Sequence, residues 1–173
     1  MGMVGNYRRI TQQKLAELQN HPESITDFLF PGYEADKASE LNGSYLYIDK
    51  TWHAIHFLLT GTALPSQPPL TNVVMGGKPL GDPENPDFDF SPACFLNPSE
   101  VKEASEEISK ISKAEFQARF NPSELIKADI YPTIVWQRRG EEDNKYLTNY
   151  FLLLFKFFQE AAKLGEVVLF YIC

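Results

Sequence analysis

The side chains best suited to chemistry at neutral pH lie in one stretch of the chain, residues 48–61. Asp49, His53 and His56 are spaced so that a helix would carry all three on one side. Two imidazoles and a carboxylate can hold a divalent metal ion, or can form an acid–base pair with an orienting group. This spacing makes the stretch the first candidate for a functional site.

A structural interpretation explains the same residues. Asp49 is of the type that caps a helix N-terminus, and Gly61 is of the type that ends one. The helix would bury one face, formed by Trp52, Ile55, His56 and Leu59. The histidines would then be core residues that bind other side chains or carbonyl groups. Because a capping aspartate has little freedom to bind a metal and no second ligand cluster follows, we expect no metal and no cofactor.

Two aromatic residues further along the chain, Tyr131 and Trp136, could form the wall of a pocket or join a core aromatic cluster. The candidate pocket therefore consists of Asp49, Trp52, His53, His56, Tyr131 and Trp136. Other motifs are weaker. Residues 76–79 read Gly-Gly-Lys-Pro and lack the spaced glycines and the Lys-Ser/Thr pair of a phosphate-binding loop. Cys94 and Cys173 have apolar neighbours and are interpreted as buried thiols.

The net charge of −7 is concentrated in one window, residues 82–107. This window holds eight acidic residues and one basic residue, while the rest of the chain is balanced. Such an acidic surface would repel phosphate groups, so we expect no nucleic-acid partner and no anionic membrane surface. It could attract a basic protein partner, or it could be only a solvated loop and helix face.

Composition indicates a single domain in a reducing cytoplasm. A chain of 173 residues is long enough to bury a core by itself. Two cysteines are too few for a disulfide framework, and no secretory signal is recognisable near Met1. The strongest apolar run, residues 151–158, is far shorter than the roughly 20 residues of a membrane span.

The pattern of apolar residues predicts an α+β fold over residues 1–173. Its mixed sheet would contain strands near 3–8, 71–75, 93–96 and 167–172, the last a continuous apolar run of the kind that is covered on both faces. About six helices would pack on it, including 98–110, 113–120, 122–128 and a long C-terminal helix over 142–164. Asn97, Ser112 and Asn121 would cap the first three, each with a glutamate three residues further on. Residues 33–43 read as polar and irregular, with room for one helical turn, and Asn42-Gly43 reads as a turn. The proline-rich segment 60–92 reads mostly as a loop, which could cover the sheet or close a cleft.

Several segments together resemble a known family. They are the N-terminal Met-Gly-Met-Val-Gly-Asn-Tyr, the whole of residues 48–61, Val73 to Gly77, Arg119 to Pro122, Asp129 to Pro132 and the terminal Val-Leu-Phe-Tyr-Ile-Cys. On these residues the chain is similar to the YfbM-like family of bacterial proteins from end to end. The resemblance implies a single α+β domain from a bacterial cytoplasm. It implies no activity, because that family is a domain of unknown function.

Two classes of function fit the sequence. The first is a binding or interaction module, of an immunity or regulatory type, in which the acidic residues 82–107 meet a basic partner. The second is a small enzyme or ligand-binding protein that uses His53 and His56 in a cleft closed by residues 60–92. We favour the first, because the acidic excess is present in the sequence itself whereas the catalytic set must be assembled from weak parts.

Overall fold

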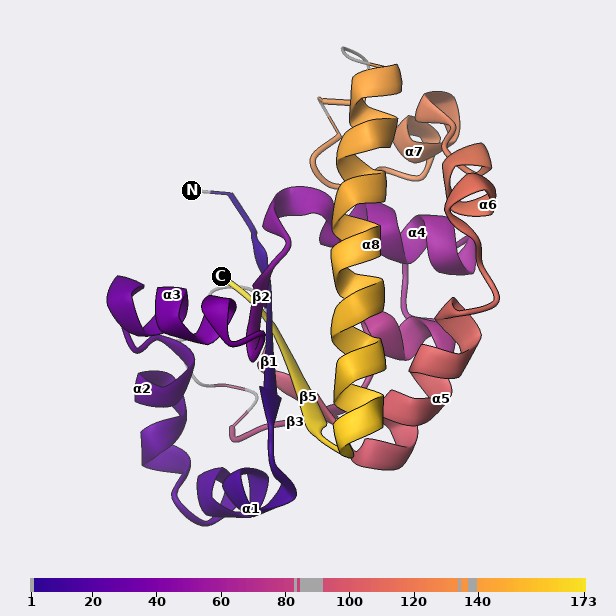
Figure 1. Ribbon diagram of the computed structural model, residues 1–173. Coiled ribbons are helices and arrows are strands. Elements are labelled where there is room, and N and C mark those ends of the chain that lie inside the picture. Colours follow the sequence, from indigo (N-terminus) through magenta and orange to yellow (C-terminus); the bar gives the residue numbers. More distant parts are fainter. Residues whose placement is uncertain (1, 83, 85–91, 134, 137–139) are drawn as a thin grey trace.

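A five-stranded antiparallel sheet lies in the middle of the molecule, with helices on both of its faces (Figure 1). The computed structural model describes residues 2–82, 84, 92–133, 135–136 and 140–173. The strands are β1 (Gly5–Ile10), β2 (Tyr45–Tyr47), β3 (Lys78–Pro79), β4 (Cys94–Leu96) and β5 (Val167–Ile172). Their order across the sheet is β2-β1-β5-β4-β3, so β2 is an edge strand and β5 is central.

The helices form two unequal layers (Figure 1). One face of the sheet carries α1 (Gln12–Asn20), α2 (Ile25–Leu29) and α3 (Tyr33–Leu41). The other carries α4 (Trp52–Thr60), α5 (Pro98–Ile108), α6 (Lys113–Ala118), α7 (Pro122–Lys127) and the long α8 (Glu141–Leu164). Short 3₁₀ helices span Pro22–Ser24, Asp49–Thr51 and Leu70–Val73. Within the described ranges, no helix combines the length and apolarity that crossing a membrane requires.

The central strand β5 is covered on both faces, as its continuous apolar sequence predicted. Val168 and Ile172 belong to the core under α8, whereas Val167, Leu169 and Tyr171 belong to a second core under α1 and α2. This alternation follows from the two-residue period of a strand. The sheet therefore separates two apolar cores, and the larger one lies on the α8 side.

Helix starts were the best-predicted local feature. Asn97 and Ser112 each complete a capping box, with Glu100 and Glu115 bound back to the cap. Asn121 also accepts hydrogen bonds from the first turn of its helix. These side chains satisfy backbone N–H groups that no intrahelical partner can reach, which is why sequence alone locates them.

Four expectations about the fold were wrong. Residues 71–75 form no strand; a 3₁₀ helix occupies Leu70–Val73, because an apolar run of this length indicates burial without fixing the backbone conformation. The strand β2 was not predicted. Residues 33–43, expected to be irregular, include the whole of α3, which buries none of its residues and so has no apolar stripe to reveal it. The sheet, expected to be mixed, pairs only antiparallel strands within the described residues.

Candidate functional site

The helix predicted around the histidines is present as α4, and its predicted buried face is confirmed. Trp52, Ile55, His56 and Leu59 are all buried. Gly61 adopts a left-handed conformation with φ of 77° and ends the helix, a backbone shape that favours glycine. The packing of this stretch therefore agrees with the structural interpretation of its sequence.

Asp49 is not the N-cap of this helix. Its own φ is 50°, and it begins a 3₁₀ turn, so α4 starts three residues later without a side-chain cap. Its carboxylate instead accepts hydrogen bonds from the hydroxyl groups of Tyr47, at 3.1 Å, and Tyr146, at 2.6 Å. The predicted cap is wrong because two tyrosines from β2 and α8, distant in sequence, bind the carboxylate.

His53 is half-buried and uses both of its ring nitrogens. Its Nε2–H donates to the carbonyl oxygen of Ala63 at 3.0 Å, and its Nδ1 accepts the backbone N–H of Tyr131 at 3.0 Å. Its ring stacks on Trp52 with 4.9 Å between centroids. Burial lowers the pKa of His53, so the imidazole is neutral at neutral pH. The residue ties two distant loops to α4.

His56 is fully buried, and its Nε2–H donates to the carbonyl oxygen of Leu64 at 2.9 Å. Burial also lowers its pKa. The two histidines therefore hold consecutive carbonyl groups of the same loop, Ala63 and Leu64. Asp49 binds tyrosines elsewhere, so the three predicted residues do not meet at one reactive centre, and the described residues contain no group able to hold a metal ion.

Tyr131 and Trp136 mainly pack against other residues of the fold, as in a core aromatic cluster. The Tyr131 hydroxyl accepts the backbone N–H of Met3 at 2.9 Å, and its ring stacks with Trp52. Trp136 is buried and donates its indole N–H to Ile130 at 2.8 Å. Trp136 and Asp49 do line one cavity of about 240 Å³, while Trp52 lines a different, mostly apolar cavity of about 380 Å³. Trp52, His53 and Tyr131 are thus brought together in one stacked cluster, whereas Asp49 and Trp136 line a separate cavity and His56 lies in the core.

A more open site lies at the sheet edge, where β2 runs between α3 and α8 (Figure 1). Two cavities meet there, one of about 440 Å³ against α8 and one of about 420 Å³ against α3. They share three lining residues, Glu40, Tyr45 and Tyr47, and so form one continuous depression. We call it the edge groove. The remaining lining residues include Arg9, Gly43, Tyr150, Leu153, Lys156, Phe157 and Glu160 on one side and Tyr33, Asp36 and Lys37 on the other.

The floor of the edge groove is a backbone that lacks a partner strand. Arg9 and Gly5 of β1 bond to Ser44 and Ile48, the residues that flank β2. Because hydrogen-bonded pairs alternate in an antiparallel ladder, the N–H and C=O groups of Tyr45 and Tyr47 point away from β1. In the described sheet β2 pairs with β1 alone, so these backbone groups face the groove.

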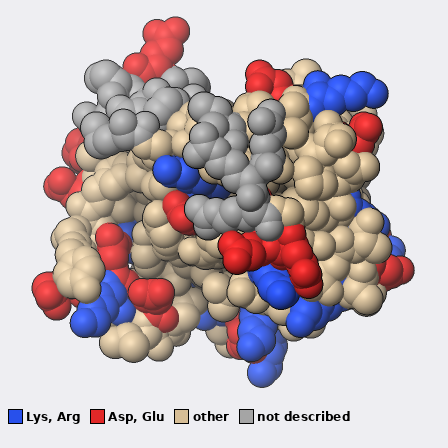
Figure 2. All heavy atoms as spheres, turned by 90° about the horizontal axis from the view of Figure 1, so that it is seen from above, with Lys and Arg blue, Asp and Glu red and all other residues tan. Residues whose placement is uncertain are grey.

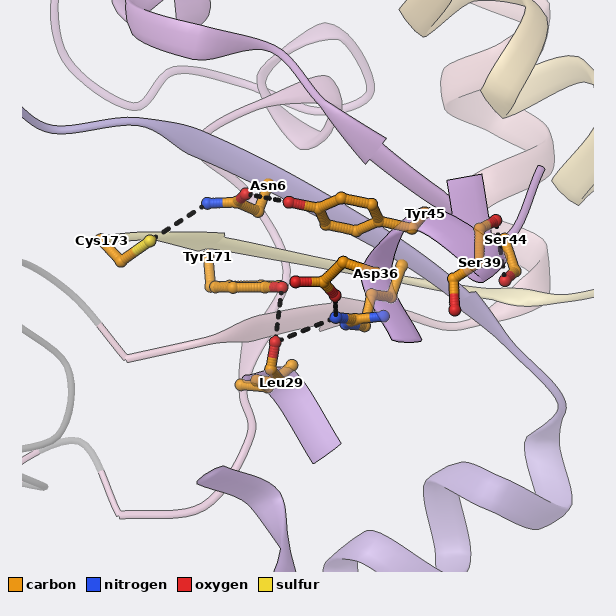
Figure 3. A network of polar contacts seen from close by, with 9 residues as sticks. Asn6, Leu29, Asp36, Ser39, Ser44, Tyr45, Tyr171 and Cys173 are labelled. Atoms are coloured by element: carbon orange, nitrogen blue, oxygen red, sulfur yellow. Dashed lines mark hydrogen bonds and ion pairs between the residues drawn. The ribbon is translucent and has the colours of Figure 1, made fainter. Parts of the chain in front are cut away.

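Tyr45 is held rigidly by polar contacts on the α3 side of the sheet (Figure 3). Its hydroxyl donates to Asn6 at 2.8 Å, and Arg8 lies 4.7 Å from its ring centroid. Burial, followed by the charge of Asp36, raises the pKa of Tyr45 to about 12. Arg8 is almost fully buried and binds Asp36 of α3 and the carbonyl oxygen of Leu29. This network fixes α3 as one wall of the groove.

The opposite end of β2 is fixed by Asp49. Burial, followed by the charge of this carboxylate, raises the pKa of Tyr47 to about 12, so its hydroxyl remains a donor. Burial and the same carboxylate also raise the pKa of Tyr146, whose ring packs edge-on against Tyr150. Asp49 therefore connects β2 to α8 and has a positioning role that its sequence context did not indicate.

The acidic window is only partly described by the structure, since Asp87 and Asp89 lie outside the described residues. Glu100 binds its own helix cap, and two further acids pair with lysines, Glu106 with Lys102 and Glu107 with Lys110. The remaining described acids, Asp82, Glu84 and Glu103, form no ion pair with a described residue, and neither does Glu100. The described part of the window therefore does not establish a uniform acidic surface.

Charges of both signs are also mixed at the top of the molecule. Figure 2 shows acidic and basic side chains interspersed over the described part of this face. The first turn of α8 contributes acids, and one of them, Glu141, pairs with Lys145 at 3.5 Å. No single-sign field covers the described part of this face.

The chain belongs to a family whose members have no assigned function. A family model described as a domain of unknown function, DUF1877, matches residues 1–171. Among solved structures, the chain is similar to the protein of unknown function YfbM from Escherichia coli, with a TM-score of 0.68 and 24% sequence identity. That match covers 98% of this chain and 99% of YfbM, and it confirms the α+β fold and the YfbM-like resemblance. No curated protein matches the chain.

Proposed function

We propose that this protein is a binding module that takes an extended segment of a partner protein along β2. The observation that carries the proposal is the outward-facing backbone of Tyr45 and Tyr47, which forms the floor of the edge groove. An exposed strand edge can pair with a further strand, and proteins use this mode to bind extended peptides.

The shape of the edge groove supports a single extended chain as the ligand. Side chains of a strand point alternately to the two faces of its sheet. A segment added beside β2 would place them alternately toward α8 and α3, where the cavities of about 440 and 420 Å³ lie. The two helices flank the edge, and covering a sheet edge with helices is one way in which proteins limit aggregation there.

The rim of the edge groove supports a partner segment with basic residues. Glu40 lines both cavities and Glu160 lines the larger one. Neither carboxylate forms an ion pair with a described residue, and two lysines, Lys37 and Lys156, also line the groove. A basic side chain entering beside Glu40 would gain charge complementarity without displacing an existing pair. The proposal thus keeps the basic partner predicted from the sequence but moves its contact to the groove.

The catalytic alternative has weaker support. His53 has hydrogen-bond partners at both nitrogens, and His56 is inaccessible in the core. Burial lowers both pKa values, which favours neutral imidazoles. A general base needs a ring nitrogen that can reach the proton it removes, but both nitrogens of His53 are already bonded and His56 is buried.

The experiment uses a display library of short random peptides, with dissociation constants measured for the selected sequences. Tyr47→Pro removes the N–H that faces the groove and leaves the β1 ladder intact, because proline is tolerated on an edge strand. Tyr47→Val removes the same side chain but keeps the N–H. We expect Tyr47→Pro to weaken binding by about tenfold more than Tyr47→Val. Equal binding by the two variants, or failure to select any peptide, would overturn the proposal.

A further inference from the structure

Arg9 lies at the bottom of the edge groove with hydrogen-bonding capacity to spare. Its side chain is only 9% exposed, and its guanidinium lies 5.4 Å from the ring centroid of Phe157. One ion pair reaches it, from Glu166 to Nε at 3.5 Å. Buried Nε and Nη1 have no hydrogen-bond partner among the described residues. Since a guanidinium has five N–H donors, this is a costly arrangement for a purely structural arginine.

The neighbouring Arg8 also has a buried Nε without a hydrogen-bond partner among the described residues, but its terminal nitrogen Nη2 is bound twice. Arg8 points to the opposite face of the same strand and is more deeply buried, with 5% of its side chain exposed against 9% for Arg9. There its guanidinium binds the Asp36 carboxylate and the carbonyl oxygen of Leu29 (Figure 3). Arg9 has no equivalent of either hydrogen bond among the described residues, although it lies in a cavity where an oxygen ligand could supply one.

Gly43 keeps the approach to Arg9 open. It lines the same cavity, and a Cβ added to it would lie 3.3 Å from Nη2 of Arg9. A side chain at this position would therefore occupy the space beside the guanidinium. Gly43 also has a φ of 78°, which other residues adopt only with strain. Its missing side chain leaves a notch through which a small oxygen-bearing group can reach Nη2.

We infer that Arg9 binds a carboxylate of the segment that occupies the edge groove, either an acidic side chain or the C-terminal carboxylate. This inference rests on the proposed function and names the chemistry of one residue of its ligand. A planar carboxylate matches the fork of N–H donors on a guanidinium, and such charge-assisted bonds are the strong ones. The basic residues of the segment would lie at the rim near Glu40, and the carboxylate would lie at the floor.

The test compares short random-peptide libraries that carry Glu, Gln or Lys at one fixed central position. For selected sequences, dissociation constants are measured with Glu and with Gln at that position, and with a free or an amidated C-terminus. We expect one carboxylate, central or terminal, to bind about tenfold tighter than its neutral counterpart. The central and terminal arms distinguish the two sources of the carboxylate. Equal affinity in both arms would overturn the inference.

The variant Arg9→Gln links this preference to the groove floor. We expect it to abolish the preference for the carboxylate while the neutral peptides keep their affinity, which also shows that the variant is folded. Lys113→Gln, at an exposed position of α6 that does not line the groove, is the matched control and should leave the preference intact. If the preference for the carboxylate survives in Arg9→Gln, only the inference about Arg9 is overturned. If the wild-type protein binds no peptide at all, the proposed function is overturned as well.

A second pair of variants tests the role of Arg9 independently, in case Arg9→Gln does not fold. Gly43→Ala fills the notch, and Gly32→Ala introduces alanine at a similar positive φ of 96° with nothing within 4 Å of the new Cβ. Only Gly43→Ala should reduce the preference for the carboxylate. Equal behaviour of the two alanine variants would count against access through the notch and would overturn the assignment of Arg9.

Discussion

Two regions of this molecule contain polar groups that lack a hydrogen-bond partner among the described residues, and they differ in whether those groups lie beside an open cavity. Nδ1 of His56 is unpaired but lies in the core, whereas Arg9 lines the edge groove. In α4, His53 and His56 bind the carbonyl groups of one loop and are closed off from ligands. In the edge groove, the outward backbone groups of β2 have no partner strand among the described residues. Arg9 lines the same groove, and two of its buried nitrogens have no hydrogen-bond partner among those residues. The residue types of α4 suggest a function in the sequence, whereas the edge groove is recognisable only in three dimensions.

The difference teaches that residue type is a poor guide to function when burial is unknown. Histidine is the side chain that titrates near neutral pH, which draws attention to it in any sequence. Once buried with carbonyl acceptors, it serves to hold a loop. A short edge strand contains ordinary residues, yet its unpaired backbone is available for binding. The predictions below test this contrast, beginning with the largest expected effect.

Replacing His56 should give the largest loss of stability. The ring is fully buried and donates to Leu64, so His56→Ala leaves both a cavity and an unpaired carbonyl group. We expect the free energy of unfolding in urea to fall by about 2–3 kcal/mol. His21→Ala, at an exposed position, is the control. If His56→Ala keeps the stability of the wild type but no longer binds peptide, α4 would be the binding region and the assignment of the edge groove would be wrong.

Acidification should also destabilise the protein, because two imidazoles contribute. The pKa values of His53 and His56 are lowered in the folded state, with burial as the main cause. The unfolded chain therefore binds more protons once the pH falls below about 6.5, the ordinary pKa of histidine. The free energy of unfolding should be highest above that pH and decline below it. In His53→Gln the free energy of unfolding should decline less steeply as the pH falls. An unchanged pH profile would show that protonation of His53 does not contribute to the acid destabilisation.

Removing the Tyr146 hydroxyl tests how α8 is joined to β2. Tyr146→Phe deletes the 2.6 Å hydrogen bond to Asp49 in a half-buried site. We expect a loss of about 1 kcal/mol in the free energy of unfolding and a modest weakening of peptide binding, because the groove wall is less well fixed. Stability equal to that of the wild type would mean that the hydroxyl group does not position Asp49.

The smallest effect on stability is expected from Tyr47→Phe. The lost hydrogen bond to Asp49, at 3.1 Å, lies at an exposed position, where water can replace it. The free energy of unfolding should change by less than about 0.5 kcal/mol. A larger loss in thermal or urea denaturation would indicate that the β2 edge is a structural element and not a free binding surface.

Sequence reasoning succeeded where a feature depends on local chemistry or a long periodic pattern. The caps at Asn97 and Ser112 satisfy nearby backbone groups, and the length of α8 follows from its apolar stripe. The central position of β5 follows from an apolar run that needs cover on both faces. Each of these features is encoded in residues that are adjacent in the chain.

The edge groove was missed because its parts come from distant segments. β2 has only three residues, and a signal for it was present in the Asn42-Gly43 turn followed by tyrosines at alternate positions. Nothing local shows that Arg9 would lack partners while Arg8 found Asp36, since both depend on helices placed by the tertiary fold. The role of Asp49 was misjudged for the same reason, because its tyrosine partners come from β2 and α8.

Amide hydrogen exchange, measured with and without a peptide selected from the library, tests the central claim most directly. Binding along β2 should slow exchange at the N–H groups of Tyr45 and Tyr47, which then donate to the added segment. Exchange in α4 and the loop that follows it, residues 52–64, should not change. Protection that appears in residues 52–64, with none at Tyr45 and Tyr47, would contradict the assignment of the edge groove as the binding site.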